Sequence, residues 1–329
     1  MDNSGYILST QNRHYSFTPT ELSSLRKHTL ELSLTPLASP PALTAHHTLK
    51  ILTHYTLTLS KLCHHFGVPS AVRGTAITIL HRLYLHLSPV TTHPKTLLLP
   101  ILLLAMKTEL GGTSISQFIR TAEEVGLSTT KKELQSPELM IAAGLRWSLT
   151  VRHPWRGLDG AMVVLIREFG DQEDARIRKA SQKARQWLTG DCFMTDAGFL
   201  YTPSQLLWAA LWAQDQELID RYMKGRFSDE VAEKIKECAD VFVFGTRKIA
   251  GCEEEAIRWG GAVNEKELVS EAKVGDRMVH LARKELDQGR KRAEEEALGR
   301  EAEERERRKK KRKMEMEKMK ADDVFGPAL

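Results

Sequence analysis

The stretch LLLPILLLAM, residues 97–106, is the longest apolar run of the chain and decides the fold class. It follows His93-Pro94, a pair that suits a helix start because proline is well tolerated in the first turn. A helix without a polar face must be covered by other elements on every side. The run is also far shorter than the roughly 20 apolar residues of a membrane span. It therefore predicts the central helix of a helical bundle.

Helical patterns flank this run on both sides. Upstream, residues 43–66 and a segment starting at Pro69-Ser70 repeat apolar residues at steps of three and four. Downstream, residues 114–125 resume the pattern, and Ser136-Pro137 starts a fifth helix that runs to about residue 147. These five predicted helices form one unit, residues 43–150, which we call the first bundle.

A comparable series follows His153-Pro154. Its predicted helices span residues 155–169, 174–188, 202–213, 218–223 and 228–249. Almost no stretch alternates between polar and apolar residues as a half-buried strand does. We therefore expect an all-α fold of two similar five-helix units in tandem, with residues 151–262 as the second bundle.

Both ends of the chain add a helix to this pair of bundles. Within residues 1–42, Thr18, Pro19 and Glu21 form a capping-box start, which Thr202 and Gln205 repeat in the second bundle. The N-terminal helix carries one apolar stripe: Leu22, Leu25, Thr29 and Leu32.

The last segment, residues 263–329, reads as one long charged helix or tail. Its apolar positions are spaced 4, 3, 4, 3 and 4 apart, the seam of a docked helix: Leu268, Ala272, Gly275, Val279, Ala282 and Leu286. Half of them are Ala or Gly, which favours docking on the N-terminal helix or a partner over self-dimerisation.

Charge is concentrated near the C-terminus. The chain has a net charge of +5, and residues 291–320 alone hold 13 basic and 9 acidic side chains, so the rest is nearly neutral. Arg307–Lys313 are seven basic residues in a row, which suits a nuclear import signal, a nucleic-acid tail or a solvated helix. A compact DNA-binding domain is not expected, because such domains spread basic residues over the folded surface.

The sequence contains no catalytic or cofactor motif. Phosphate-binding loops, dinucleotide fingerprints, nucleophile elbows and HExxH helices are all missing, so we expect no enzyme, no catalytic residue and no cofactor. Four cysteines without a CxxC pair, and no secretory signal, indicate a reducing intracellular compartment. Six potential ligands share one predicted helix but not the spacing of three or four that a metal site needs: His46, His47, His54, Cys63, His64 and His65. We expect no metal.

Several motifs in order resemble the cyclin family. Residues 82–85 (RLYL), His93-Pro94, residues 103–109 (LLAMKTE) and Gln117-Phe118 match the first cyclin box in order and spacing. Residues 149–160 (LTVRHPWRGLDG) and 195–207 (TDAGFLYTPSQLL) are similar to one transcriptional branch of the family. The resemblance covers about residues 13 to 260 and implies two tandem cyclin boxes with flanking helices.

This resemblance implies a regulatory subunit of a cyclin-dependent kinase, here the CDK-activating kinase of the transcription and repair factor TFIIH. It implies a nuclear protein that supports phosphorylation of CDK activation loops and of the RNA polymerase II C-terminal domain, with a RING-finger assembly factor and the TFIIH core as further partners. Cyclins face their kinase with a lysine near the end of the third helix and a glutamate early in the fifth. Lys107 and Glu138 stand at those positions.

Residues 44–66 lack the Met-Arg-Ala-Ile-Leu stretch with which cell-cycle cyclins recruit substrates, so we do not expect such recruitment. Three alternatives remain open. One is another transcriptional cyclin of the cyclin C type, against which residues 195–207 argue. Another is a TFIIB-like factor whose tandem cyclin folds bind DNA, against which the near-neutral bundles argue. The third is a long-tailed scaffold without a kinase.

Overall fold

The apolar run lies in α6 (Pro94–Leu110), at the centre of the first bundle, in a computed structural model that describes residues 4–243 and 265–324. Helix α6 packs against α4 (Ala45–His65), α5 (Ser70–Leu83) and α9 (Glu138–Gly144). Seven of its apolar side chains between positions 97 and 105 are buried: Leu97, Leu98, Ile101, Leu102, Leu103, Leu104 and Ala105. The predicted central helix is therefore confirmed.

The first bundle is completed by α7 (Ile115–Glu124) and α8 (Lys131–Gln135). The short α8 was not predicted; Thr130 and Glu133 form a capping box at its start. The fifth predicted helix begins at Glu138 as expected but ends at Gly144, earlier than the predicted end near residue 147. It ends there because Arg146 and Trp147 have left-handed backbone, which stops a right-handed helix.

The second bundle repeats this plan with its own core. It begins with a turn of 3-10 helix, η1 (Pro154–Gly157). Its five longer helices are α10 (Leu158–Phe169), α11 (Asp174–Thr189), α13 (Pro203–Gln214), α14 (Gln216–Met223) and α15 (Asp229–Cys238). Shorter turns are η2 (Asp171–Glu173), η3 (Asp191–Met194) and α12 (Ala197–Leu200). A π-helical turn, η4 (Ala239–Val243), follows α15, and residues 244–249 of the last predicted helix lie outside the described residues. All regular elements within the described ranges are helical, so the all-α prediction is confirmed.

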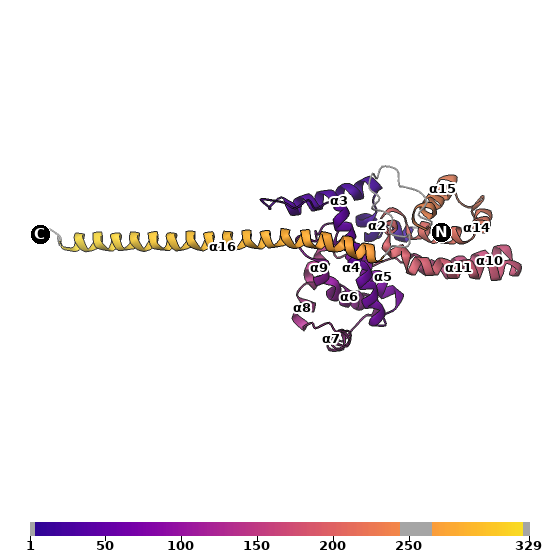
Figure 1. The fold of residues 1–329 in the computed structure, drawn as a ribbon, viewed down its shortest axis with the longest axis horizontal. Helices are drawn as coiled ribbons and strands as arrows, with labels where there is room; N and C mark the ends of the chain where they lie inside the picture. Colours follow the sequence, from indigo (N-terminus) through magenta and orange to yellow (C-terminus); the bar gives the residue numbers. More distant parts are fainter. Residues whose placement is uncertain (1–3, 244–264, 325–329) are drawn as a thin grey trace.

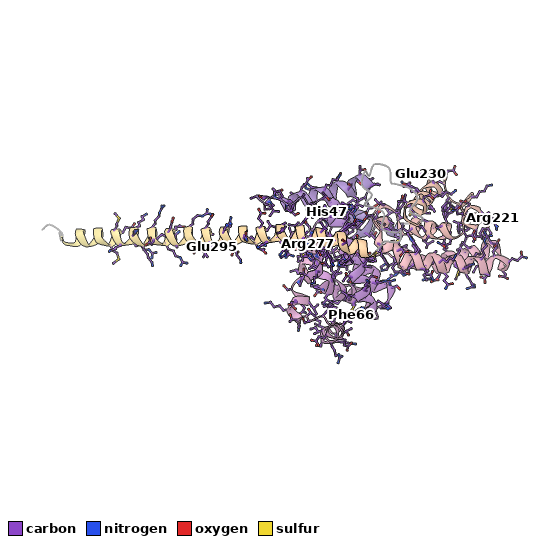
Figure 2. The ribbon with its side chains drawn as sticks, viewed as in Figure 1. His47, Phe66, Arg221, Glu230, Arg277 and Glu295 are labelled. Carbon is purple, nitrogen blue, oxygen red and sulfur yellow. The ribbon has the colours of Figure 1, made fainter. Side chains whose placement is uncertain are left out.

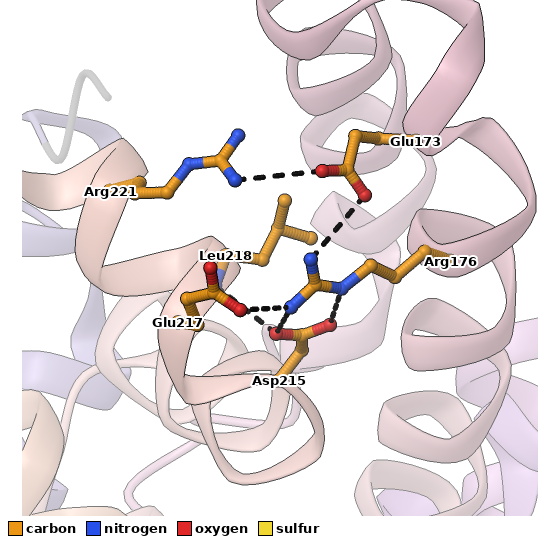
Figure 3. A network of polar contacts seen from close by, with 6 residues as sticks. All are labelled: Glu173, Arg176, Asp215, Glu217, Leu218 and Arg221. Atoms are coloured by element: carbon orange, nitrogen blue, oxygen red, sulfur yellow. Dashed lines mark hydrogen bonds and ion pairs between the residues drawn. The ribbon is translucent and has the colours of Figure 1, made fainter.

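A network of ion pairs closes one side of the second bundle (Figure 3). Arg176 of α11 pairs with Asp215, where α13 meets α14, with Glu217 of α14 and with Glu173. Arg221 of α14 also pairs with Glu173. Each of the two arginines pairs with an acidic side chain of a neighbouring element, so the role of this network is to hold the elements of the second bundle together.

Three helices precede the first bundle: α1 (Ser4–Ile7), α2 (Thr10–Tyr15) and α3 (Pro19–Leu34). The predicted capping boxes of Thr18 with Glu21 and of Thr202 with Gln205 are both present. The predicted stripe of α3 is partly wrong. Leu32 is exposed, and Leu30 and Ser33 are buried in its place, because the helix packs on two different neighbours along its length.

The C-terminal helix α16 (Glu265–Val324) lies along α4 and then leaves the body, as Figure 1 shows. The predicted seam is buried at Leu268, Ala272, Val279 and Ala282. It docks on α4 of the first bundle, which corrects the expectation of docking on the N-terminal helix.

Gly275 allows α16 to pack closely on α4, because a Cβ at this position would lie 2.9 Å from the side chain of Ile51 in α4. Only a glycine lets the two helices approach this closely.

Beyond Leu286, every side chain of α16 that the structure describes is exposed, and Glu295 lies on this projecting part (Figure 2). Glutamate-to-arginine pairs one turn apart support the helix there, at Glu296–Arg300, Glu301–Arg305 and Glu304–Arg308. Among the described residues, no helix is both long enough and apolar enough to span a membrane.

Candidate functional site

The two predicted site residues lie together and form an ion pair. Lys107 is in the last turn of α6, and Glu138 is the first residue of α9. The ammonium of Lys107 donates to both carboxylate oxygens of Glu138, each at 2.7 Å. Both side chains are about one-third exposed, so the pair presents a fixed plus and minus charge at the surface.

Exposed apolar side chains surround this pair in sequence. Leu110 ends α6, Leu139 and Met140 follow Glu138 in α9, and Trp147 lies in the turn after α9. Trp147 and Leu139 are each 67% exposed, so both offer apolar area to a partner. We call Lys107, Leu110, Glu138, Leu139, Met140 and Trp147 the α6–α9 surface. An ion pair on helices that also carry exposed apolar side chains is suited to docking a partner that buries both.

The backbone at Arg146 and Trp147 adopts a conformation that is strained for residues other than glycine. Arg146 and Trp147 have φ values of 51° and 59°, in the left-handed region that costs a non-glycine residue roughly 1 kcal/mol or more. Their amide groups donate to the carbonyl oxygens of Ala143 and Ala142, at 2.8 and 2.9 Å. Strained residues that the surroundings hold in place are typical of functional sites.

Those surroundings come from the N-terminal helices. The Tyr15 hydroxyl of α2 donates to the carbonyl oxygen of Leu145 at 2.9 Å, and the hydroxyls of Thr10 and Ser148 lie 2.7 Å apart. The Arg82 guanidinium lies 4.4 Å from the centre of the Tyr15 ring and donates to the Ser148 carbonyl at 3.1 Å. Helix α2 and Arg82 therefore brace the turn that presents Trp147.

Arg82 is an unusual buried cation. It is 1% exposed, and its contacts among the described residues are carbonyl oxygens and the Tyr15 ring rather than a carboxylate. Burial lowers its pKa to about 10, and nearby Tyr15 and Tyr6 oppose this shift. Its importance was not predicted, since the residues that it joins are far apart in sequence.

Helix α3 is attached to the second bundle through the segment 195–207. Arg26 makes two hydrogen bonds to the buried carboxylate of Asp196, at 2.6 and 2.7 Å. The amide of Phe17 donates to the carbonyl oxygen of Phe199 at 2.9 Å. The segment that carried much of the family resemblance thus anchors the N-terminal helix.

The two bundles meet at a buried polar group. Thr75 of α5 donates to Glu109 of α6 at 2.6 Å and lies 3.1 Å from Nε2 of His153. Arg156 donates to the other oxygen of Glu109 at 2.9 Å. Burial lowers the pKa of His153 to about 4, although the Glu109 charge raises it in part. His153 is therefore neutral at physiological pH.

A cavity of about 70 Å³ lies between the bundles, lined by residues that include Gln11, His81, Arg82, His153, Cys192 and Phe199. A volume of this kind holds about five water molecules. Burial lowers the pKa of His81 to about 4, with Asp196 opposing the shift. The cavity lining thus combines the neutral imidazoles of His81 and His153 with the Arg82 cation.

The histidine-rich helix α4 does not gather metal ligands. His64 and His65 are exposed, and His47 lies 2.8 Å from the Thr44 hydroxyl in a capping box. The described part of the chain contains no group of three or more His, Cys, Asp or Glu side chains suited to a metal ion. Burial raises the pKa of the Cys63 and Cys192 thiols to about 12, so neither is a reactive thiolate. Cys252 lies outside the described residues.

Comparison with known families supports the resemblance seen in the sequence. The Cyclin C-terminal domain family matches residues 153–252. Cyclin CCL1 of Saccharomyces cerevisiae is 25% identical over 186 residues, which cover 56% of this chain and 46% of that protein. Cyclin-H of Xenopus laevis is 28% identical over 174 residues, covering 52% and 53%. The matched part of the chain spans about half the length of these curated relatives.

Solved structures match over more of the chain. A chain of the CAK complex from Chaetomium thermophilum bound to ATP-γ-S has a TM-score of 0.74 and 28% identity, covering 89% of this chain and 95% of that chain. A chain of yeast TFIIK (Kin28/Ccl1/Tfb3) has a TM-score of 0.60 at 23% identity, covering 72% and 100%, and supports the fold alone. The resemblance to the cyclin family is therefore confirmed, and the relatives to which this chain is similar include Cyclin CCL1 and Cyclin-H.

Proposed function

We propose that this chain is the regulatory cyclin subunit of a cyclin-dependent kinase, the CDK-activating kinase of TFIIH. The observation that carries this proposal is the match to a chain of the CAK complex over 89% of the sequence. The curated relatives are cyclins of the same type. On this proposal the catalytic groups belong to the kinase, and this chain supports phosphorylation of CDK activation loops and of the RNA polymerase II C-terminal domain.

The α6–α9 surface is the proposed kinase-binding surface, with Lys107 and Glu138 as its charged pair. Two N–H groups of Lys107 are used by Glu138, which leaves a third donor, and the Glu138 carboxylate retains acceptor capacity. A partner helix can supply an acceptor to Lys107 and a donor to Glu138. The two residues and the two partner groups then form a network of four hydrogen-bonded groups. Leu139 and Trp147 supply the apolar area around it.

The mechanism is one of position. Phosphoryl transfer in protein kinases requires an ion pair between the β3 lysine and the glutamate of helix αC. A rigid surface that binds αC in its inward position raises the population of kinase molecules with this pair formed. The turn at Trp147 keeps the surface rigid, because Tyr15 and Arg82 donate hydrogen bonds to the backbone on either side of it.

Charge reversal tests the two residues. Lys107→Glu or Glu138→Lys alone places like charges side by side and should weaken kinase binding by roughly 30-fold or more. The double reversal restores an ion pair inside this chain but presents its charges in the opposite order. We expect the double variant to fold with wild-type stability and still bind the kinase poorly in co-purification. Recovery of binding in the double variant would show that the pair is only structural.

Lys50 and Glu271 provide the matched control. They form a Lys–Glu pair at 2.8 Å between α4 and α16, with exposed fractions of 34% and 42%. The double reversal of this pair changes the same residue types outside the α6–α9 surface. Kinase binding should therefore remain at the wild-type level.

Further partners and location extend the same proposal. A RING-finger assembly factor and the TFIIH core are the proposed additional partners, and the nucleus is the proposed location. Purification of the tagged full-length chain from its source cells, followed by mass spectrometry, tests both partners, and fluorescence microscopy of the tagged chain tests the location. The cyclin C alternative predicts a different kinase in that sample, and the TFIIB-like alternative predicts salt-dependent binding to DNA by a chain truncated before residue 291.

A further inference from the structure

Six Ser/Thr–Pro dipeptides are potential acceptor sites for proline-directed kinases: Thr18-Pro19, Thr35-Pro36, Ser39-Pro40, Ser88-Pro89, Ser136-Pro137 and Thr202-Pro203. Thr18 and Thr202 are engaged as helix N-caps, and Ser88 is 4% exposed. Thr35 and Ser136 continue the helical backbone at the ends of α3 and α8. A kinase binds its acceptor segment in an extended form, which Thr35 and Ser136 do not have. The hydroxyls of Thr18 and Thr202 are held by cap hydrogen bonds and Ser88 is buried, so all five sites are poor substrates in the folded chain.

Ser39 differs from the other five. It lies in the exposed loop between α3 and α4, and the following proline favours an extended backbone at this position. No hydrogen bond of its hydroxyl is described in this structure. Ser39 is therefore the one Ser/Thr–Pro site of the described chain that is exposed, lies outside helical backbone and has no described hydrogen bond of its hydroxyl, since the exposed Thr18 uses its hydroxyl in the cap of α3.

The same loop contacts the C-terminal helix. One carboxylate oxygen of Glu285 in α16 accepts the amide N–H groups of Ala38 at 2.8 Å and of Ser39 at 3.2 Å. Glu285 lies at the end of the docked part of α16, because every described side chain from residue 287 onward is exposed. An added anion on Ser39 would therefore stand beside an anion that already holds this loop.

We propose that Ser39 is a phosphorylation site for a proline-directed Ser/Thr kinase and that its phosphorylation releases Glu285 from the loop. The Ser39 oxygen attacks the γ-phosphorus of ATP, the bond from that phosphorus to the bridging oxygen of ADP breaks, and the hydroxyl proton passes to the kinase base. The product carries a charge of about −2 at neutral pH. The proposal holds whichever kinase this chain binds.

The face of α16 that carries Glu285 offers no cation one turn away to pair with the phosphate. Positions one turn from Glu285 on the same face of α16 are Leu281, Ala282, Gln288 and Gly289, which offer no basic side chain. The phosphate therefore faces Glu285 without a neighbouring cation on that face.

Deeper contacts of α16 are left intact. Asp276 accepts from the Tyr55 hydroxyl at 3.1 Å and lies 3.1 Å from His93, and Gly275 packs on Ile51. The phosphate thus loosens the outer end of the docked helix while its inner part stays on α4. The part of α16 that projects from the body is then no longer held at its base by the contact of Glu285 with the loop.

The first experiment maps the acceptor. The purified full-length chain is incubated with an active mitogen-activated protein kinase and magnesium ATP, and phosphopeptides are quantified by mass spectrometry. We expect most of the incorporated phosphate on Ser39, and its loss in Ser39→Ala but not in Thr35→Ala. Phosphate placed mainly on another residue, or no incorporation, overturns the proposed site.

The second experiment tests the release. Phosphoserine is introduced at position 39 by genetic encoding, and hydrogen exchange of residues 280–289 is compared with the unmodified chain. We expect exchange to be about threefold to fivefold faster with the phosphate. In the Glu285→Gln background, which lacks the repelling charge, phosphorylation should change the rate less than twofold. Unchanged exchange on phosphorylation, or an equal increase in both backgrounds, contradicts the mechanism.

Discussion

The Arg82 guanidinium lies 4.4 Å from the centre of the Tyr15 ring, so a residue of the first bundle and one of the N-terminal helices share a buried contact. Both donate to the backbone that surrounds Trp147, Tyr15 to Leu145 and Arg82 to Ser148. Helix α2 thus helps to support the α6–α9 surface, although Tyr15 and Leu145 are 130 residues apart in sequence.

Tyr15→Phe removes only the hydroxyl that holds the Leu145 carbonyl. We expect a loss of about 1 kcal/mol in the free energy of unfolding and weaker kinase activation, because the Trp147 turn loses its brace. Tyr84→Phe is the matched control, since its hydroxyl donates to the Thr92 carbonyl at 2.7 Å within the first bundle. Urea unfolding and a kinase assay should show a similar stability loss for both variants but reduced activation only for Tyr15→Phe.

Gly74 sets the distance between the bundles. A Cβ there would lie 2.5 Å from Phe193, 2.8 Å from Trp155 and 2.9 Å from His153. Gly74→Ala should therefore destabilise the fold by about 1–3 kcal/mol, measured by urea unfolding. Gly160→Ala, in α10 with no atom within 4 Å of its added Cβ, should be neutral or stabilising. Equal stability of the two variants would argue against close packing at Gly74.

Acid should destabilise the protein through His81 and His153. Both have a folded-state pKa of about 4, caused mainly by burial, against about 6.5 in the unfolded chain. Above pH 6.5 both states hold neutral imidazoles. As the pH falls from 6.5 towards 4, only the unfolded chain takes up these protons, so the free energy of unfolding decreases.

The His153→Gln variant isolates this effect from titrating carboxylates. Its free energy of unfolding should fall less steeply between pH 6.5 and 4.5 than that of the wild type, by about 1 kcal/mol per pH unit. Urea titrations at several pH values measure both slopes. Parallel slopes would contradict a neutral, buried His153.

Gly275 should be required for the docking of α16. Gly275→Leu places a large side chain where even a Cβ lies 2.9 Å from Ile51, so residues 268–286 should lose protection in hydrogen exchange. Gly289→Leu is the control, because it lies on the exposed projecting part with no atom within 4 Å of an added Cβ. Its exchange pattern over residues 268–286 should match the wild type.

Local signals in the sequence predicted most of the helices. The buried apolar run at 97–106 and the Thr18 and Thr202 capping boxes are all confirmed, because each depends on neighbours within a few residues. Within the proposed site, the family resemblance identified Lys107 and Glu138, and the structure adds that they form an ion pair.

Long-range contacts were not predictable in the same way. Nothing in the sequence near Trp147 indicates left-handed backbone, since neither Arg146 nor Trp147 is a glycine or asparagine. The contact of Tyr15 with Leu145 and the pairing of Arg26 with Asp196 join segments more than a hundred residues apart. Docking of α16 on α4 depends on Gly275 facing Ile51, which sequence spacing alone does not identify.

Kinase turnover tests the central claim most directly. The catalytic subunit of the CDK-activating kinase is assayed with a peptide substrate and magnesium ATP, alone, with this chain, and with the Lys107→Glu/Glu138→Lys variant. We predict stimulation of roughly tenfold or more by the wild-type chain and little by the variant. Turnover with the wild-type chain that is no faster than that of the catalytic subunit alone would contradict the account.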